Sequence, residues 1–382
     1  MASQFLDFAE ARARARAFLP RALFDYIDRG IDGESALTAL RHAFDSRRVV
    51  ARVMRPVSRP DLSSRIMGHT HSSPFIVAPT ALAGLVRHDG EVLMSRAAAI
   101  SDIPFCAATQ SSTSIEDIAE GSLGNVPWFQ LYVWRDRTET WNLLERIGAL
   151  GIDTLLLTVD TPTGPKKVHN IRNGFGVPLR PSARLSLDLA IHPRWTLGVM
   201  GRYLMRGGLP SYANYPGAAA AQVTAAISDP RFALDMVLDR AFLDELRRRW
   251  TGRLVLKGIQ APQDGQMAFE AGCDAVVLSA HGGRNLDSAA LPVDLLPRMR
   301  AAVGPDATIL ADSGVQSGSD AAKLLAAGAD GVLLGRAPLW GLAAGGQDGA
   351  AQMLAILTEE LRAFMAFAGA PDLGALAALD WS

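Results

Sequence analysis

A histidine and an arginine lie three residues apart in the segment Leu278-Ser-Ala-His-Gly-Gly-Arg-Asn-Leu-Asp287. His281 follows an apolar run and precedes two glycines, which leave room for a small molecule beside the imidazole. An imidazole can act as a general base, and a guanidinium such as Arg284 can bind a carboxylate. Asp160 ends another apolar run and could orient the ring of His281. These residues predict proton abstraction from a substrate that carries a carboxylate.

Glycines and an arginine near the C-terminus indicate a phosphate site. They stand in Asp312-Ser-Gly-Val-Gln-Ser-Gly and in Gly331-Val-Leu-Leu-Gly-Arg336, at the ends of two successive apolar runs. Backbone N–H groups and a guanidinium hold phosphate oxygens well. A phosphate site alone fits a sugar phosphate as well as a flavin. Gln130, Thr158 and Lys257 end three earlier runs, and could contact a planar heterocycle and place a positive charge near a reduced flavin.

Eight short apolar runs, each followed by polar residues, glycine or proline, must position these side chains. Such runs are typical of parallel strands covered on both faces. The runs begin at Phe75, Ile103, Trp128, Thr154, Leu254, Ala275, Thr308 and Gly331. Segments of helical character separate them, at 90–100, 114–120, 138–150, 261–271, 293–303 and 319–327. The alternation predicts an α/β fold, a (β/α)8 TIM barrel, whose active site lies at the C-terminal ends of the strands.

Three segments lie outside the repeat. Residues 1–70 are predicted to be a helical cap, and residues 176–235 form a long insertion after the fourth strand. Residues 347–367 carry apolar side chains at helical spacing and are predicted to be a packing helix. We expect all of residues 1–382 to form one barrel domain.

Composition excludes several classes of function. The formal net charge is −1, from 38 basic and 39 acidic residues, so no long-range field favours nucleic acid. Two isolated cysteines, Cys106 and Cys273, are too few for a zinc site or a disulfide framework, and we expect buried free thiols and no metal. The first residues lack the apolar stretch of a signal peptide, and no run is long enough to span a membrane. We therefore expect a cytoplasmic protein.

The ordered motifs resemble the FMN-dependent 2-hydroxy acid dehydrogenase and oxidase family, which includes glycolate oxidase and the L-lactate and mandelate dehydrogenases. The resemblance covers nearly the whole chain. It rests on Leu19-Pro-Arg-Ala-Leu-Phe-Asp-Tyr26, Ala78-Pro-Thr-Ala81, Phe129-Gln-Leu-Tyr132, Thr158-Val-Asp-Thr-Pro162, Leu256-Lys-Gly258, His281-Gly-Gly-Arg284 and Gly335-Arg336.

This resemblance implies oxidation of an L-2-hydroxy acid to a 2-oxo acid. His281 would be the base with Asp160 as its partner, and the two electrons of the α C–H bond would pass to flavin N5, as hydride or through a carbanion. Tyr26 and Arg284 would hold the substrate carboxylate, with Lys167, and Tyr132 would bond the substrate hydroxyl. The FMN contacts would be Pro79, Thr80, Ala81, Thr109, Gln130, Thr158, Lys257, Ser279, Asp312, Gly314, Gln316, Gly335 and Arg336.

Three positions depart from the family pattern. Lys167 stands where the family usually has a second arginine, Gln316 replaces an arginine after the seventh strand, and Ala280 replaces the asparagine before the base. A lysine keeps the charge but loses the planar fork of a guanidinium. The departures imply looser FMN binding or an atypical substrate.

The segment 181–207 interleaves four arginines with tryptophan, tyrosine, leucine, valine and methionine against a single acid, Asp188. A basic, aromatic stretch suits a membrane interface. The same region of the family's membrane-bound mandelate and lactate dehydrogenases resembles it, including His192-Pro-Arg-Trp195. The segment thus implies peripheral attachment to the inner face of the cell membrane and a quinone as acceptor. A mobile lid or an oligomer contact is the alternative, with oxygen as acceptor.

Two other functions compete with this interpretation. One is a different FMN or phosphate barrel, such as an isomerase or an enzyme similar to IMP dehydrogenase, which would not need His281 and Arg284 together. The other is a flavin-binding, membrane-associated protein that has lost turnover, as the three departures suggest. The presence of Tyr26, Tyr132 and Asp160 argues against it. Barrels of this family are often tetramers, so we expect a homo-oligomer.

Overall fold

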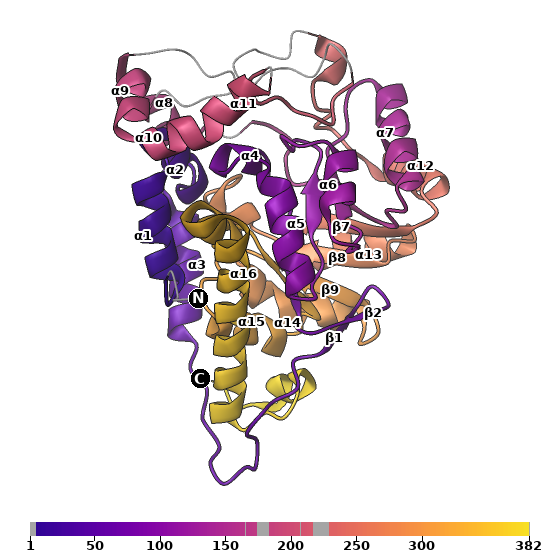
Figure 1. The fold of residues 1–382 in the computed structure, drawn as a ribbon. Coiled ribbons are helices and arrows are strands. Elements are labelled where there is room, and N and C mark those ends of the chain that lie inside the picture. Colours follow the sequence, from indigo (N-terminus) through magenta and orange to yellow (C-terminus); the bar gives the residue numbers. More distant parts are fainter. Residues whose placement is uncertain (1–4, 165, 174–182, 207, 217–228, 382) are drawn as a thin grey trace.

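Eight parallel strands form the centre of the molecule (Figure 1). The computed structural model describes residues 5–164, 166–173, 183–206, 208–216 and 229–381. The strands are β3 (Phe75–Val77), β4 (Cys106–Ala108), β5 (Trp128–Leu131), β6 (Thr154–Thr158), β7 (Arg253–Ile259), β8 (Ala275–Leu278), β9 (Thr308–Ala311) and β10 (Gly331–Leu334). Neighbours pair in the order β3-β10-β9-β8-β7-β6-β5-β4, and a bridge from Val77 to Phe105 joins the two edges. The predicted (β/α)8 barrel is confirmed.

Strand side chains alternate between two apolar layers. Ile76, Leu156 and Val255 belong to a cluster inside the barrel, whereas Phe75 and Leu155 pack into the outer core beneath the helices. The short hairpin of β1 (Ser64–Ile66) and β2 (His69–His71) adds residues to the inner cluster. Both faces of each strand are therefore dry, which explains why the runs are apolar throughout.

Six helices lie where the sequence predicts them, each between two strands. They are α5 (Gly90–Ile100), α6 (Ile115–Gly121), α7 (Arg137–Ala149), α13 (Pro262–Glu270), α14 (Pro292–Val303) and α15 (Gly318–Ala326). A short helix, α4 (Ala83–Val86), precedes α5, and α12 (Arg240–Arg249) precedes β7. The long α16 (Arg336–Ala368) starts directly after β10 and kinks at Gly345 and Gly346. Its second half is the predicted packing helix.

The N-terminal cap is helical over a shorter span than predicted. Its helices are α1 (Phe8–Phe18), α2 (Arg21–Asp28) and α3 (Ser35–Ser46), and no helix occupies residues 47–70. Pro56 and Pro60 lie in that stretch, and proline has no backbone N–H to continue a helix. Helix α3 is fixed to the barrel because Asp287, after β8, accepts from the backbone N–H groups of Gly33 and Ala36.

The insertion after β6 contains helices where it is described. They are α8 (Val168–Asn173), α9 (Ala183–Ile191), α10 (Pro193–Trp195), the π-helix η1 (Thr196–Gly201), α11 (Arg202–Met205) and the 3-10 helix η3 (Pro230–Phe232). Residues 174–182 and 217–228 of the predicted insertion lie outside the described residues. Trp195 and Val199 are buried, and Trp195 Nε1 donates to the carbonyl of Leu85 at 2.7 Å. The insertion thus packs on α4, at the top of Figure 1.

Both cysteines are free and buried, as predicted. Among the described residues, no group of three or more His, Cys, Asp or Glu side chains could hold a metal ion. None of the described helices is long and apolar enough to cross a membrane.

Candidate active site

The predicted base and its partner meet at the C-terminal end of the barrel. His281 follows β8 and Asp160 follows β6, and His281 Nδ1 lies 3.0 Å from each carboxylate oxygen of Asp160. His281 has a φ of 50°, and Gly282 and Gly283 continue in the same left-handed region. A non-glycine residue rarely adopts this conformation, and such strain gathers at functional sites. The turn presents the imidazole at the strand end.

Two residues without a role in the sequence analysis fix Asp160. Asn285 donates from Nδ2 to the carbonyl of Asp160 at 2.8 Å. Gly258, with a φ of 105°, lies so close that a Cβ there would be 2.5 Å from the carboxyl carbon of Asp160. Burial raises the pKa of Asp160, but its hydrogen bond to His281 and the charges of His281 and Lys257 outweigh burial and lower it overall. Asp160 therefore stays a carboxylate.

Two cations flank Tyr26, which α2 carries over the barrel. Lys167 Nζ lies 4.9 Å and the Arg284 guanidinium 5.0 Å from the centre of its ring. Neither cation forms an ion pair with a carboxylate in the described part of the chain. Burial lowers the pKa of Lys167 below its ordinary value, and Arg284 lowers it further. Partly buried positive charges without acidic partners create a site for an anion.

Tyr132, after β5, lies near the same group of residues. Its backbone N–H donates to Thr109 Oγ1 at 2.9 Å, and Thr109 Oγ1 donates to the carbonyl of Gln130 at 2.7 Å. Burial is the main cause that raises the pKa of Tyr132, and the charge of Asp160 adds to it. The phenol therefore keeps its proton and can donate a hydrogen bond at neutral pH.

Lys257 belongs to a buried polar network. Its Nζ donates to Asp312 Oδ2 at 2.6 Å and to Ser279 Oγ at 3.2 Å, and Ser279 Oγ donates to Asp312 Oδ1 at 2.6 Å. Burial lowers the pKa of Lys257, but the charges of Asp312 and Asp160 outweigh it and raise the pKa overall. Lys257 is therefore a cation at the strand end.

Ser313 adds a contact that the sequence analysis missed. Its Oγ accepts from the backbone N–H groups of Ala280 and Gly282 at 3.1 and 3.0 Å and donates to Asp312. Ser313 thus joins the buried network to the turn of His281. The serine lies in a glycine-containing loop, and no feature of its sequence indicates the distant N–H groups that it binds.

Arg336 is a partly buried cation with spare hydrogen-bonding capacity. Nε donates to the carbonyl of Ile27 at 2.9 Å and Nη1 to that of Gly282 at 2.9 Å, whereas Nη2 is buried without a partner in the described residues. Burial lowers the pKa of Arg336 to about 10. Gly335 precedes it, with open space where a Cβ would stand. A phosphate group would fit between this glycine and the free N–H.

Orphaned polar atoms mark the rest of a ligand site. In the described part of the chain, eight buried side-chain nitrogen or oxygen atoms lack a partner. Four of them belong to residues predicted to contact FMN: Thr80 Oγ1, Gln130 Nε2, Thr158 Oγ1 and Arg336 Nη2. Buried polar atoms are rarely left without a hydrogen bond, so this group favours a bound polar molecule. The residues present fit FMN.

The other residues predicted to contact FMN lie in different surroundings. Pro79 and Ala81 flank Thr80 in the loop after β3, on the same strand end. Gly314 has a φ of 86° and lies against Leu40 and Phe44 of α3. Gln316 is exposed at the start of α15, where its backbone N–H donates to Asp320.

Comparison with known proteins agrees with this geometry. The model of the FMN-dependent dehydrogenase family matches residues 15–380. An L-lactate dehydrogenase of Pseudomonas syringae is 37% identical over 96% of this chain and 95% of its own length. A putative L-lactate dehydrogenase of Mycobacterium tuberculosis is 35% identical over 92% of this chain and 83% of its own length.

Solved structures give the same result. A monotopic membrane protein, (S)-mandelate dehydrogenase, superposes with a TM-score of 0.92 at 33% identity, over 99% of this chain and 100% of its own. Mandelate oxidase with (S)-4-hydroxymandelic acid has a TM-score of 0.84 at 33% identity and covers 99% of both chains. The chain belongs to the FMN-dependent dehydrogenase family.

Proposed function

We propose that this protein oxidises an L-2-hydroxy acid to the 2-oxo acid with FMN as its cofactor. The observation that carries the proposal is the pairing of His281 with Asp160, 3.0 Å apart, next to the cations of Lys167 and Arg284. A base and an anion site side by side match a substrate whose reacting carbon is bonded to a carboxylate. The relatives named for L-lactate and mandelate act on acids of this kind.

His281 acts as the general base. A carboxylate only accepts hydrogen bonds, so Nδ1 carries the proton that it donates to Asp160 and Nε2 is left to take a proton from the substrate. The resulting imidazolium is stabilised by the negative charge of Asp160. Tyr132, held in its protonated form, donates to the substrate oxygen.

Arg284, Lys167 and Tyr26 bind the substrate carboxylate. Arg284 Nη1 donates to the carbonyls of Tyr26 and Ile27 at 2.6 and 3.2 Å, which fixes its side chain. Fixed guanidinium donors bind a carboxylate with little loss of side-chain entropy. These groups orient the α carbon towards His281 and so reduce the cost of reaching the reacting geometry.

The cofactor contacts are the orphaned atoms and the cations around them. Gln130, Thr158 and Thr80 would bond the polar edge of the ring system, and Gly335 with Arg336 would hold the phosphate. Lys257, held by Asp312 and Ser279, would supply a positive charge to the ring system. When bound, FMN accepts the two electrons of the substrate's α C–H bond.

The experiment is anaerobic mixing of the FMN-loaded protein with a panel of 2-hydroxy acids, small and aromatic, followed by flavin absorbance. We expect bleaching by at least one L-2-hydroxy acid and none by its D enantiomer. Lys166→Met, which removes an exposed lysine adjacent to Lys167, serves as a control variant. Its flavin should bleach at the same rate as that of the unchanged protein. Failure to bleach with any acid while FMN stays bound would contradict the proposal.

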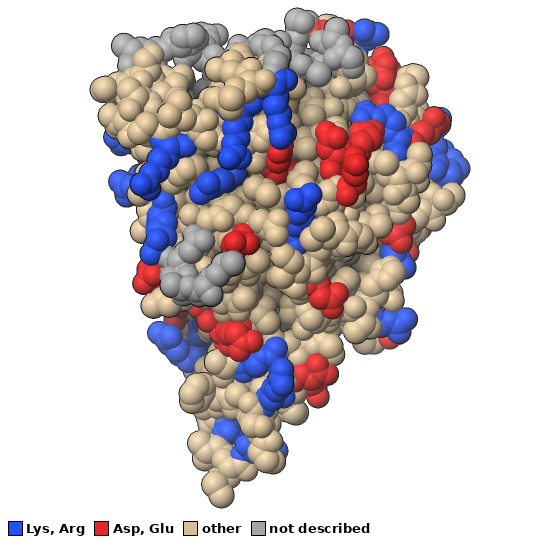
Figure 2. Space-filling model, viewed as in Figure 1, with Lys and Arg blue, Asp and Glu red and all other residues tan. Residues whose placement is uncertain are grey.

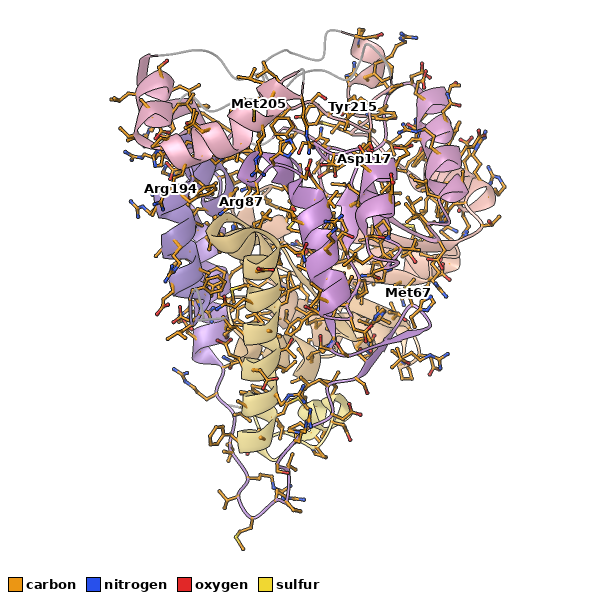
Figure 3. All side chains as sticks on the ribbon, viewed as in Figure 1. Met67, Arg87, Asp117, Arg194, Met205 and Tyr215 are labelled. Atoms are coloured by element: carbon orange, nitrogen blue, oxygen red, sulfur yellow. The ribbon has the colours of Figure 1, made fainter. Side chains whose placement is uncertain are left out.

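We also propose that the insertion rests on a membrane surface, with a quinone as electron acceptor. Leu187, Ile191, Leu197, Leu204 and Met205 are exposed by 65, 65, 71, 62 and 79%. Figure 2 shows a largely uncharged surface over the insertion with basic side chains along its lower edge, and Figure 3 labels Arg194 and Met205 there. Apolar side chains bordered by arginines favour an interface between lipid tails and anionic headgroups.

The membrane proposal is tested by sedimentation with vesicles that contain anionic phospholipid. The unchanged protein should sediment with the vesicles, and Leu197→Asp with Leu204→Asp should remain in the supernatant. Leu123→Asp is the control, because Leu123 is equally exposed, at 64%, but lies after α6. If the unchanged protein stays in the supernatant, the surface has another role, and oxygen consumption then tests oxygen as acceptor.

A second exposed apolar group supports self-association. Val53, Met54 and Phe367 are exposed by 82, 97 and 81%. The backbone carbonyl of Arg52 lies close to Gly369, so the three residues share one region at the far end of the molecule from the insertion (Figure 1). We infer that copies of the chain associate through this region to form a homo-oligomer. Light scattering tests this by comparing the molar mass of Met54→Asp with that of the unchanged protein.

A further inference from the structure

Helix α2 begins without a capping side chain of its own. Its N-cap residue is Pro20, which makes no side-chain cap hydrogen bond. The first N–H groups of a helix have no partner within the helix and need an acceptor from elsewhere. Asp188 supplies it from the insertion. Its Oδ1 accepts from the N–H of Arg21 at 3.1 Å and its Oδ2 from the N–H of Ala22 at 3.2 Å.

Asp188 is held in place for this contact. His192, one turn further along, lies with Nδ1 2.7 Å from the carbonyl oxygen of Asp188 and 3.3 Å from its Oδ1. The Asp188 side chain is only 14% exposed. It is also the single acid of residues 181–207, among four arginines. Its negative charge faces the positive end of the α2 dipole, which adds to the hydrogen bonds.

The capped helix carries Tyr26, and the contact therefore reaches the substrate site. The Tyr26 ring lies between Lys167 and Arg284, and its carbonyl accepts from Arg284 Nη1 at 2.6 Å. Asn173 of α8 makes a further contact from the insertion to α2 through Asp25. A shift of α2 would thus move the Tyr26 ring and its hydroxyl relative to Lys167 and Arg284.

We propose that Asp188 is a positioning residue for substrate binding, which acts through the N-terminus of α2 on Tyr26. The proposal rests on the proposed function, in which Tyr26 and Arg284 bind the carboxylate. A purely structural cap would change the stability of the fold and leave the affinity for substrate alone. A positioning residue changes KM in a way that depends on Tyr26.

The first experiment compares Asp188→Ala and Asp188→Asn with Thr196→Val. We expect Asp188→Ala to raise KM for the hydroxy acid about five- to tenfold, the scale of a lost helix cap. The rate of flavin reduction at saturation and the FMN content should change less than about twofold, because carboxylate binding is shared by ground state and transition state. Asparagine caps helices as well as aspartate, so Asp188→Asn should restore most of the affinity.

Thr196→Val is the matched control. Thr196 Oγ1 donates to the carbonyl of Leu189 at 2.7 Å, so this variant removes a hydrogen bond inside the insertion without a contact to α2. It should leave KM unchanged. Thermal unfolding of all variants separates lost stability from lost affinity, because a variant that is folded and FMN-loaded at the assay temperature reports on affinity alone.

The second experiment is a double-mutant cycle with Tyr26→Phe. If Asp188 acts through Tyr26, Asp188→Ala should add less than about twofold to KM once the Tyr26 hydroxyl is gone. Additive increases would overturn the proposal, since Asp188 would then act by another route. An unchanged KM in Asp188→Ala, with a raised KM in Tyr26→Phe, would overturn it and leave the proposed function intact. An unchanged KM in Tyr26→Phe would instead contradict the role of Tyr26 in the proposed function, and this inference with it.

Discussion

His281 Nδ1 lies 3.0 Å from both carboxylate oxygens of Asp160. The two residues follow strands β8 and β6, which are separated in the barrel by β7 alone. Gly258 of β7 leaves room for the Asp160 side chain beside His281, because any side chain at position 258 would occupy the position of Asp160. The pair therefore depends on three adjacent strand ends, and each can be tested.

Replacement of His281 by alanine should strongly slow flavin reduction by hydroxy acids. A positioned general base contributes about 10²–10⁴-fold to a rate, so we expect a loss in this range. Stopped-flow absorbance of the FMN-loaded variant measures it, and the visible flavin spectrum shows that the cofactor is still bound. Flavin reduction at an unchanged rate would show that another group removes the proton.

Gly258→Ala should inactivate the enzyme through Asp160. A Cβ at this position would lie 2.6 Å from Asp160 Cβ, and the φ of 105° adds backbone strain. Displacement of the carboxylate would leave His281 without its partner, so the variant should lose activity as Asp160→Ala does. The matched control is Gly151→Ala, which has a φ of 76° but open space around the added carbon. If both alanine variants lose the same activity, strain and not the contact with Asp160 is the cause.

The sequence was sufficient for the barrel because its strands are covered on both faces. Leu155 and Leu156 point into different layers, and both layers are apolar, so the run stands out from its surroundings. The ends of such runs identified Asp160, Lys257 and His281 as neighbours. This inference needs only the fact that parallel strands end at one face of the barrel.

Contacts between loops could not be found in the same way. Ser313 binds N–H groups more than 30 residues away in sequence, and Asn285 binds a carbonyl on another strand end. Neither contact follows from periodicity. The sequence also predicts a helical cap over the proline-containing stretch after Ser46, where the structure has no helix. Asp188 stood out in the sequence as a lone acid, but its partner N–H groups lie on α2.

Replacement of Arg336 by alanine should weaken the binding of FMN more than that of riboflavin. A charge-assisted hydrogen bond of about 1.5–3 kcal/mol corresponds to a roughly 10- to 100-fold rise in Kd. Riboflavin has the same ring system without the phosphate, so its affinity should stay within about twofold. Fluorescence titration of the apoprotein measures both constants. An equal loss for the two ligands would mean that Arg336 supports the fold through Ile27 and Gly282 and not the phosphate.

Substrate binding should weaken at alkaline pH, and it should do so at a lower pH than the ordinary pKa of a lysine predicts. Burial lowers the pKa of Lys167 from 10.5, so its positive charge is lost as pH rises through that lowered value, and kcat/KM should fall with it. A guanidinium keeps its proton to higher pH than an amine does, so Lys167→Arg should move the alkaline fall to higher pH. Lys166→Arg makes the same chemical change at the exposed neighbouring position and should leave the profile where it was. Because Lys167→Arg keeps the positive charge beside Tyr26, any shift of the alkaline fall comes from the titration of residue 167 itself. An alkaline fall that stays in place in both variants would assign it to Tyr26, whose pKa is lowered by Lys167 and Arg284 against the effect of burial.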